Sequence, residues 1–476
     1  MKKKYITSAI PYVNASPHIG HALEFVQTDA LVRYYKLQGF DTLYLCGSDE
    51  NALKNLQAAE KEGISVQKLV DKNTVLFQKL ATELNVRFDV FQKGSDKKKH
   101  FVSSQKFWQL CWDNGDIYKK NYEGLYCVGC EMFYTPDELD DNGECFEHPG
   151  KKLEKVSETN YFFRLSKYQK ELTDWITKNT IKIVPQTRKN EVLSFLKQPL
   201  QDISISRSNE RAKNWGVPVP NDPDQRMYVW FDALNIYQSG IGFGLDEDKY
   251  EKWWPADIHV IGKGIIRFHA IYWPAFLYSA GLKLPKSIFV HGYITVEGQK
   301  MSKTIGNVID PFALIKKYGA DAVRYYLLRE IPSIGDGDYS EHRMQEVYNA
   351  DLANELGNLV SRVTNLAEKE GLVISKSDQK ILLTAKNDIG NAVENFELNR
   401  AIEYIWLWVK GLNKKLDQEA PWKKSSLGRK IIVQEMINEL NNVGQQLSLF
   451  LPETAEKIMQ ATQGKIRKAE SLFPKR

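Results

Sequence analysis

The pattern of apolar and polar positions predicts alternating strands and helices over about the first 115 residues. Residues 4–9 have the pattern of a short buried strand, which Pro11 ends. Apolar residues then recur with a helical period from Ile19 onward, and this helix is expected to end near Gly39. Residues 41–50 form a second predicted strand, and an amphipathic helix follows it. This order is typical of a βαβ unit in a doubly wound sheet.

The pattern changes near residue 121, where a cysteine cluster, turns and short strand-like pieces begin. The alternation resumes near residue 226 and is carried by 227–234, 257–262, an apolar helix near 265–280, and 287–296. From about residue 339 the pattern is helical, and 350–371 is its clearest example.

The predicted fold class is therefore α/β: a Rossmann-type doubly wound parallel sheet, split by an insertion and followed by an all-α helical bundle. The expected domains are the first half of the Rossmann domain, the insertion, the second half and the helical bundle, at 1–120, 121–225, 226–338 and 339–476.

Two histidines stand where the first strand gives way to the first helix. Ser16 and Pro17 are expected to be the N-cap and the first helical residue. His18 and His21 then lie in the first turn, where backbone N–H groups and the helix dipole attract anions. Gly20 lacks a side chain, which leaves room for a ligand to approach the backbone. The pattern predicts a phosphate site.

A second unusual segment is VEGQKMSKTIGN at 296–307. It follows a strand that we assign to the same sheet as the histidine turn, and its Gly298 and Gly306 are expected to act as hinges. On that assignment Lys300 and Lys303 reach a triphosphate held by the histidines. Two lysines in a loop are more often only solvated charge. No G-x-G-x-x-G or Walker-type motif accompanies the sheet, which disfavours those phosphate loops.

Composition narrows the protein class only slightly. A chain of 476 residues is expected to hold two to four modules, with 42% apolar and 26% charged residues. The 65 Lys and Arg residues exceed the 60 Asp and Glu residues by five, which only weakly indicates a polyanionic partner. No signal peptide and no apolar run of about 20 residues is present. We therefore predict a cytoplasmic protein that does not bind a membrane.

Cysteines cluster in the insertion. The segment 127–150 has a Cys-x2-Cys-x14-Cys-x2-His spacing, which suits one structural, tetrahedral zinc ion per chain. The predicted ligands are Cys127, Cys130, Cys145 and His148. A loop that has lost its metal and keeps four reduced residues is the alternative. Cys46 and Cys111 lie in apolar settings and are expected in the core.

The two unusual segments also match known signatures. PHIGHA at 17–22 is similar to the HIGH signature of class I aminoacyl-tRNA synthetases, and KMSKT at 300–304 is similar to their KMSKS signature. Their spacing around an insertion makes the pair specific. Over essentially the whole chain, AIPYVNASPHIGHALE, YVWFDAL, FVHGYITVEGQKMSK, NELGNLVSR and EAPW resemble the methionyl-tRNA synthetase family.

This resemblance implies a ligase that uses ATP to convert methionine to methionyl-adenylate and pyrophosphate. The methionine then passes to the 3′-terminal ribose of methionine tRNA, including the initiator. The residues expected to bind the ATP phosphates, together with Mg²⁺, are His18, Gly20, His21, Lys300 and Lys303. Lys303 is the strongest catalytic candidate. No general base for the transfer step is visible.

The family's methionine pocket maps onto residues from both halves of the sheet: Ile10, Tyr12, Asp49, Trp230, Tyr237, His269 and Tyr272. Aromatic rings suit a thioether, and Asp49 matches the carboxylate that holds the amino group. Each aromatic residue alone fits core packing equally well. Asn51, Ala52 and Gly264 depart from the family pattern, in which Asp-Glu-His-Gly and Gly-Lys-Asp are common.

In the helical region the resemblance implies that Asn358, Arg362 and Trp422 read the anticodon. Asn and Arg side chains can form hydrogen bonds with base edges, and an exposed Trp can stack on a splayed base. The alternative is that Trp422 is buried in the helical region. The chain ends at SLFPKR without the further domain that makes some members dimeric, so a monomer is expected. The rival interpretations are a class I synthetase for another apolar amino acid and a non-catalytic tRNA-binding paralogue.

Overall fold

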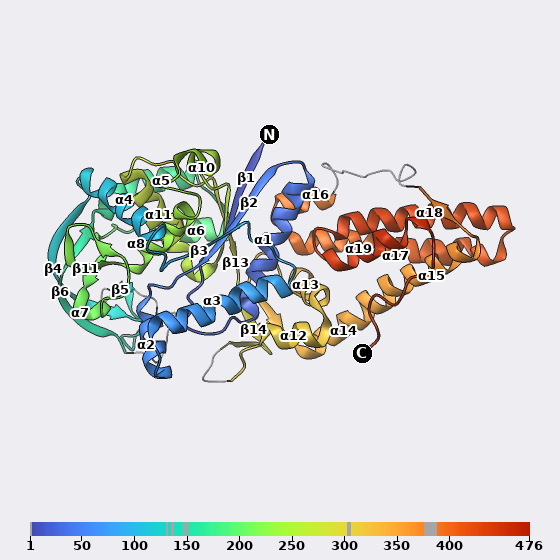
Figure 1. Ribbon diagram of the computed structural model, residues 1–476, viewed down its shortest axis with the longest axis horizontal. Helices are drawn as coiled ribbons and strands as arrows, with labels where there is room; N and C mark the ends of the chain where they lie inside the picture. The colour runs from blue at the N-terminus through green and yellow to red at the C-terminus, as the bar shows by residue number, and fades with distance from the viewer. Residues whose placement is uncertain are drawn as a thin grey trace. The chain divides into compact units, whose positions relative to one another are not determined.

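The structure is a computed structural model that describes residues 2–129, 132–134, 138–145, 150, 152–301, 306–375 and 388–476 (Figure 1). It forms two compact units. The sheet unit comprises Met1–Pro17, Asp41–Lys79 and Phe88–His291, and the helical unit comprises His18–Phe40, Leu80–Arg87 and Gly292–Arg476. Each unit is described by itself below.

A six-stranded parallel sheet forms the centre of the sheet unit, in the order β3-β2-β1-β12-β13-β7. Its strands are β1 Lys3–Ser8, β2 Asp41–Ser48, β3 Val90–Lys93, β7 Lys182–Val184, β12 Ile258–Gly262 and β13 Ser287–His291. Five of them follow the 3-2-1-4-5 order of a doubly wound sheet, with the change of direction between β1 and β12. The predicted parallel α/β sheet is confirmed. The edge strand β7 comes from within 121–225, the range predicted for the insertion.

Two smaller antiparallel sheets complete the strands of the sheet unit. One has the order β5-β4-β6-β8, built from β4 Ile117–Cys127, β5 Met132–Tyr134, β6 Glu154–Phe163 and β8 Ile203–Ser204. The other has the order β10-β11-β9, built from β9 Ser206–Ser208, β10 Pro218–Val219 and β11 Asp222–Met227. Long antiparallel pairing of β4 with β6 gives this part of the chain its own framework.

The helices of the sheet unit are α2 Leu53–Glu62, α4 His100–Asp113, α5 Gln169–Thr177, α6 Gln186–Phe195, α7 Asn209–Ala212, α8 Val229–Leu234, α9 Ile236–Ser239, α10 Glu247–Trp253 and α11 Trp273–Ser279. A π-helix, η4 Phe268–Tyr272, precedes α11, and short 3₁₀ turns occur at Leu165–Tyr168 and Lys263–Ile265. Buried rings of α4, α8 and α11 meet edge to face or tilted, for example Phe107 with Phe231 at 5.2 Å and with Trp273 at 5.6 Å between centroids. This aromatic core fixes α8 and α11. The helix α3 Val66–Glu83 belongs to the sheet unit up to Lys79 and to the helical unit from Leu80.

The helical unit contains α1 Ile19–Leu37, α12 Pro311–Tyr318, α13 Ala320–Arg329, α14 Glu341–Val347, α15 Asn358–Lys369, α16 Asp388–Glu394, α17 Leu398–Glu419, α18 Ser426–Leu447 and α19 Pro452–Ala461, with the π-helix η5 Tyr348–Gly357 and the 3₁₀ turn η7 Pro421–Lys423. Helices α15, α17, α18 and α19 lie side by side (Figure 1). The helical C-terminal region is therefore confirmed. Among the described residues no helix is both long and apolar enough to cross a membrane.

The helical unit also holds short strands, in a sheet of order β15-β14-β16 and in a pair. Their bounds are β14 Ile294–Val296, β15 Gln299–Lys300, β16 Gly337–Tyr339, β17 Val373–Ile374 and β18 Gly464–Lys465.

One prediction about local structure was wrong, and the structure refines another. The segment 287–296 splits, because β13 ends at His291 and β14 joins the small sheet of the helical unit. A Cβ at Gly292 would lie 1.8 Å from the Gly335 carbonyl oxygen, so only glycine permits this close passage of the chain. The KMSKT segment therefore does not follow a strand of the six-stranded sheet. The predicted helix at 350–371 is a π-helix up to Gly357 and an α-helix only from Asn358.

Candidate active site

The two histidines cap the first helix. The N-cap is His18 and the helix begins at Ile19, so the prediction that Ser16 is the cap was wrong. His18 Nδ1 accepts the N–H of Gly20 at 3.1 Å, and His21 Nδ1 accepts the N–H of His18 at 3.1 Å. Imidazoles thus replace the usual hydroxyl or carboxylate as partners of the first N–H groups. The ring centroids are 3.9 Å apart.

This arrangement fixes which nitrogen of each ring faces a ligand. An Nδ1 atom that accepts a backbone N–H carries no proton, so in the neutral ring the proton is on Nε2. Each histidine therefore has an Nε2–H donor, the group that suits a phosphate oxygen. A Cβ at Gly20 would lie 2.9 Å from Cε1 of His18, so the absent side chain also protects the position of this ring.

The segment around the second signature meets the histidine turn. The N–H of Ile19 donates to the carbonyl oxygen of Ile309 at 3.2 Å. The Met301 Cε atom is 4.0 Å from the place of a Cβ at Gly20. Asn307 Nδ2 donates to the carbonyl oxygen of Lys300 at 3.2 Å, which joins the described residues on either side of 302–305. The two signature segments are thus neighbours within the helical unit.

The lysines of that segment are only partly described. Lys300 ends β15 and is exposed, whereas Lys303 lies outside the described residues. Gly298 and Gly306 have φ values of +74° and +76°, a region that favours glycine, so both glycines are needed for this loop conformation. The φ values do not test whether the two glycines act as hinges, which stays a prediction.

The residues predicted to bind methionine gather at the carboxyl ends of the parallel strands. Tyr12 follows β1 and pairs with Asp49, which follows β2, in an isolated β-bridge. The ring of Tyr12 meets Trp230 edge to face at 6.1 Å, and Trp230 meets His269 at 6.3 Å. His269 in turn bonds Tyr237.

Tyr272 and Ile10 lie at the margin of this group. Tyr272 packs on Phe268 at 5.4 Å, and Phe268 stacks on Trp230 at 3.6 Å. Ile10 packs against the same apolar cluster. This packed cluster of Tyr12, Trp230, Tyr237, His269 and Tyr272 is called the aromatic chamber below. Since ligands of open α/β sheets bind outside the carboxyl ends of the strands, it lies where a substrate is expected.

A π-helix carries two of these residues, His269 and Tyr272. Such wide turns are rare and occur often at functional sites. A ten-residue π-helix, Tyr348–Gly357, likewise ends just before Asn358, which the resemblance assigns to the anticodon. Sequence periodicity did not predict either π-helix, because apolar residues continue through both segments with a helical spacing.

His269 is a neutral, oriented group. Its Nδ1–H donates to the carbonyl oxygen of Ile265 at 2.9 Å, and the hydroxyl of Tyr237 lies 2.8 Å from Nε2. Nε2 is then an acceptor, so Tyr237 donates. Complete burial lowers the pKa of His269 to about 4.

A second buried histidine was missed by sequence analysis. His259 Nδ1 is 2.7 Å from Thr7 Oγ1, and its ring lies 4.4 Å from that of Tyr237. Burial lowers the pKa of His259 well below its usual value, and the neighbouring His269 lowers it further. A polar residue in the otherwise apolar strand at 258–262 was the available signal.

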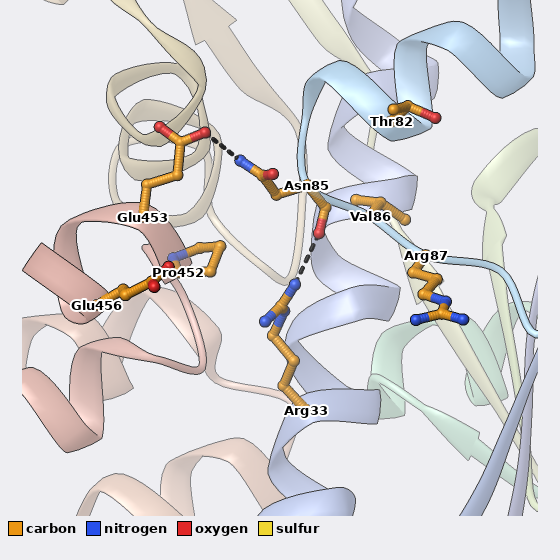
Figure 2. A pocket seen from close by; sticks show the side chains of 8 residues that line it. All are labelled: Arg33, Thr82, Asn85, Val86, Arg87, Pro452, Glu453 and Glu456. Atoms are coloured by element: carbon orange, nitrogen blue, oxygen red, sulfur yellow. Dashed lines mark hydrogen bonds between the residues drawn. The ribbon is translucent and has the colours of Figure 1, made fainter.

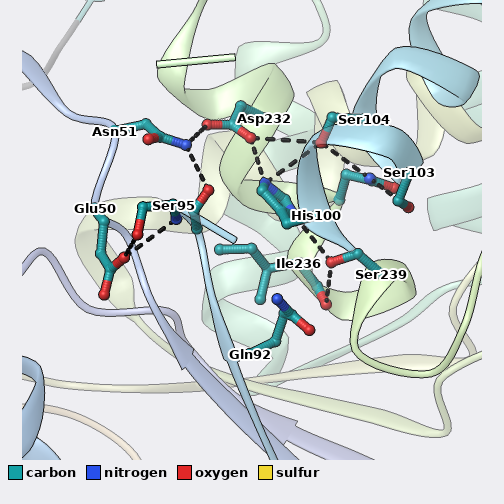
Figure 3. A network of polar contacts seen from close by, with 12 residues as sticks. Glu50, Asn51, Gln92, Ser95, His100, Ser103, Ser104, Asp232, Ile236 and Ser239 are labelled. Atoms are coloured by element: carbon teal, nitrogen blue, oxygen red, sulfur yellow. Dashed lines mark hydrogen bonds and ion pairs between the residues drawn. The ribbon is translucent and has the colours of Figure 1, made fainter. Parts of the chain in front are cut away.

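In the segment from Asp49 to Ala52, Asn51 and Ala52 depart from the family pattern. Hydrogen bonds of buried side chains hold this segment in place. Glu50 is fully buried and accepts the hydroxyls of Ser48 and Thr74 at 2.8 Å each. Asn51 donates to Asp232 Oδ2 at 2.6 Å (Figure 3). Ala52 is the N-cap of α2 and supplies no side-chain cap. Gly264, the third departure, lies in the 3₁₀ turn Lys263–Ile265.

The predicted anticodon residues are exposed. Asn358 and Arg362 stand four residues apart on one face of α15. Arg362 forms an ion pair of 2.6 Å with Asp417, near the end of α17. Trp422 follows in η7 and is 48% exposed, so the alternative of a buried Trp422 was wrong.

The zinc prediction can be examined at two of its four ligands. Cys127 ends β4 and Cys145 follows the turn closed by Asp140, and both thiols are buried. Cys130 and His148 lie outside the described residues. The described residues contain no group of three potential metal ligands. Cys46 and Cys111 are fully buried, as predicted for core residues.

A separate hollow of about 400 Å³ opens on the helical unit (Figure 2). Hydrogen bonds from Arg33 to the carbonyl oxygen of Asn85, at 2.7 Å, and from Asn85 Nδ2 to Glu453, at 2.8 Å, cross its wall. Its lining residues are Arg33, Thr82, Asn85, Val86, Arg87, Pro452, Glu453 and Glu456. None of the predicted site residues is among them.

Comparison with known proteins supports the family resemblance that the two signature segments indicated. Residues 4–364 match the family described as tRNA synthetases class I (M). The methionine–tRNA ligase of Brucella suis is 42% identical over 473 residues, 96% of this chain and 91% of that protein. That of Thermosynechococcus vestitus is 40% identical over 98% of this chain and 92% of its own length.

Solved structures agree with these relatives. The Mycobacterium tuberculosis methionyl-tRNA synthetase in complex with methionyl-adenylate has a TM-score of 0.92 and 38% identity, with 100% of both chains covered. Its apo form has a TM-score of 0.84 and 35% identity, covering 100% of this chain and 98% of that one. The chain therefore belongs to the class I tRNA synthetases, in the methionine group of that family.

Proposed function

We propose that this chain is a methionine–tRNA ligase: it activates methionine with ATP and charges the corresponding tRNA. The observation that carries the proposal is the meeting of the two signature segments, through the Ile19–Ile309 hydrogen bond and the contact of Met301 with the Gly20 turn. Relatives named methionine–tRNA ligase span nearly the whole chain at about 40% identity, which supports the same reaction here.

In the first step the carboxylate of methionine attacks the α-phosphorus of ATP. A bond forms between carboxylate oxygen and phosphorus, the bond to the bridging oxygen breaks, and pyrophosphate leaves with its electron pair. The Nε2–H groups of His18 and His21 bind phosphate oxygens, and Lys300 and Lys303 offset the charge that grows on the leaving group. Mg²⁺ bound to ATP would offset phosphate charge alongside these histidines and lysines. No protein nucleophile takes part, so positioning and charge supply the catalysis.

The aromatic chamber selects methionine. Trp230, stacked on Phe268, offers a polarisable wall for the thioether. The Tyr237 hydroxyl is committed to the neutral His269, so neither group presents a charge to the apolar side chain. Asp49 is 2% exposed and supplies the carboxylate that pairs with the ammonium group. The complex of a 38% identical relative with methionyl-adenylate supports this assignment.

In the second step a hydroxyl of the 3′-terminal ribose of tRNA attacks the adenylate carbonyl, and AMP leaves. Recognition of methionine tRNA, including the initiator, rests on the exposed set Asn358, Arg362 and Trp422. Asp417 pairs with Arg362 and lies five residues before Trp422, so these side chains share one end of the helical bundle. The protein acts as a monomer in the cytoplasm.

A structural zinc ion in the insertion is part of the proposal. Cys127 pairs with Met132 across the β4–β5 hairpin, the position of the first ligand in a hairpin knuckle. Cys145 follows a second tight turn, in which Asp140 Oδ1 accepts the N–H groups of Asn142 and Glu144. Cys127 and Cys145 are both buried, which fits a closed structural zinc site. With Cys130 and His148 they would hold zinc, which supplies folding energy to the insertion.

The test is ATP–pyrophosphate exchange with each of the twenty amino acids, followed by charging of tRNA. Exchange is expected with methionine alone, and Lys303→Ala is expected to lower its rate far more than it weakens methionine binding. Lys316→Ala, which removes another exposed lysine, is the control. Faster exchange with another apolar amino acid, or RNA binding without exchange, would overturn the proposal in favour of one of the two rivals.

A further inference from the structure

A buried polar network joins α8, α9 and the segment after β2, which carry Trp230, Tyr237 and Asp49 (Figure 3). Asp232 on α8 is 1% exposed and accepts hydrogen bonds from three side chains. They come from Asn51 Nδ2 at 2.6 Å, from His100 Nε2 at the start of α4, and from Ser104 Oγ at 3.5 Å. His100 Nδ1 lies 2.8 Å from Ser239 Oγ on α9. The sequence separations are 181 and 132 residues, so tertiary folding alone makes the contacts.

Three members of the network each lie two residues beyond Asp49 or a residue of the chamber in the sequence. Asn51 is two residues beyond Asp49, Asp232 is two residues beyond Trp230, and Ser239 is two residues beyond Tyr237. Asn51 also donates to the carbonyl oxygen of Gly94 at 2.8 Å, which anchors it to the segment after β3. The network therefore connects the ammonium-binding side of the chamber with both of its aromatic walls.

Burial makes this connection rigid. His100 is fully buried and Asn51 is 7% exposed, so water does not readily replace a lost partner. The Asn51 Oδ1 atom has no hydrogen-bond partner among the residues the structure describes, so this side chain acts through its two N–H donors. The buried hydrogen bonds that Asn51, Asp232 and His100 do form hold their elements in one arrangement.

We propose that Asn51, Asp232 and His100 form a positioning network that sets the distance between the Asp49 carboxylate and the Trp230 and Tyr237 walls. This distance selects the length of the thioether side chain. The inference rests on the proposed function, since it presumes that methionine occupies the chamber. None of the three residues is assigned a contact with the substrate; each acts through the neighbour whose place it fixes.

The test compares Asn51→Leu with Asn51→His in ATP–pyrophosphate exchange with methionine and with ethionine, which is one methylene longer. Leucine removes both N–H donors. Histidine keeps one N–H donor. We expect Asn51→Leu to raise the KM for methionine about tenfold, to leave the KM for ATP within about twofold, and to reduce the preference for methionine over ethionine about tenfold. Asn51→His should retain most of that preference.

Asp116→Asn is the control for a simple loss of stability. Asp116 is a buried carboxylate that accepts hydrogen bonds from Lys167 and Ser279, away from the residues of the network. This variant should melt earlier without any change in KM or in preference, because a smaller folded fraction scales all rates alike. If Asn51→Leu cannot be purified folded, Asn51→Ala is read in the same way.

The outcomes separate this inference from the proposed function. If the unaltered protein shows no methionine-dependent exchange, the proposed function fails. If it shows exchange while Asn51→Leu keeps the methionine KM and the preference over ethionine, the positioning role is wrong.

Discussion

The hydroxyl of Tyr237 donates to Nε2 of His269 at 2.8 Å, and both side chains are buried in the aromatic chamber. The bond requires an unprotonated Nε2, so it exists only while the ring is neutral. Burial secures this state by lowering the pKa of His269 to about 4. A protonated ring would place a charge in an apolar chamber.

This relationship predicts an acid-sensitive stability. The unfolded chain binds a proton on His269 near pH 6.5 and the folded chain only near pH 4, so stability falls as pH drops through this window. Between pH 7.5 and 5.0 the titration of His269 lowers the free energy of unfolding by about 2 kcal/mol. His269→Gln should lose correspondingly less stability over that range in urea denaturation. His342→Gln, at an exposed histidine, should match the unaltered protein. Equal losses in all three proteins would contradict the prediction.

Gly20→Ala is expected to slow adenylate formation about 10- to 100-fold. The added Cβ would press on Cε1 of His18 at 2.9 Å and displace the imidazole from its capping position. The rate of pyrophosphate exchange measures the effect. Gly411→Ala is the matched control, because a Cβ there meets no atom within 4 Å and the position is inside α17. An unchanged rate in Gly20→Ala would show that the position of His18 does not depend on this glycine.

Arg324 is expected to be essential for the stability of the helical unit. Its fully buried guanidinium donates to Asp29 at 2.8 Å and to the carbonyl oxygens of Leu84 and Phe450 at 2.9 and 2.6 Å. Arg324→Met removes one hydrogen-bond partner from Asp29 and from each of two carbonyl groups. It should therefore lower the free energy of unfolding by about 3–5 kcal/mol. Arg343→Met, which removes exposed ion pairs, should cost at most about 1 kcal/mol. Similar melting temperatures for the two variants would refute the difference.

Trp422→Ala is expected to weaken tRNA binding by about 1–3 kcal/mol, the usual loss for one stacked base. The ring is 48% exposed, so stability should change little. Pyrophosphate exchange needs no tRNA and should remain near normal, while aminoacylation falls. Leu407→Ala, at an exposed position in the middle of α17, serves as the control. A parallel fall in exchange and aminoacylation would rule out an anticodon role for Trp422.

Metal analysis of the purified protein is expected to give about one zinc ion per chain, as one closed four-ligand site requires. Cys127→Ser should lose the metal and make the insertion sensitive to protease. Cys111→Ser changes a buried cysteine outside the predicted ligand set and should keep the metal. Fully active, metal-free protein prepared without chelators would argue against the site.

The sequence by itself determined the α/β class of this fold and indicated the family to which the chain belongs. Strand and helix periods reflect which face of an element is buried, and this is a local property of the chain. The parallel sheet, the helical C-terminal region and the core positions of Cys46 and Cys111 followed from such patterns. The two signatures were recognisable because each is a short run of residues that can be identified without its distant partners.

Only the tertiary structure decided the features that depend on partners distant in sequence. His18, and not Ser16, caps α1, because the cap is settled by which side chain reaches the free N–H groups. The chain leaves the large sheet at Gly292. There it passes Gly335, which lies 43 positions further on, too closely for any side chain at position 292. Asn51, Asp232 and His100 give no periodic signal, since each is a single buried polar residue. Their hydrogen bonds form only once folding removes them from water and leaves them one another as partners.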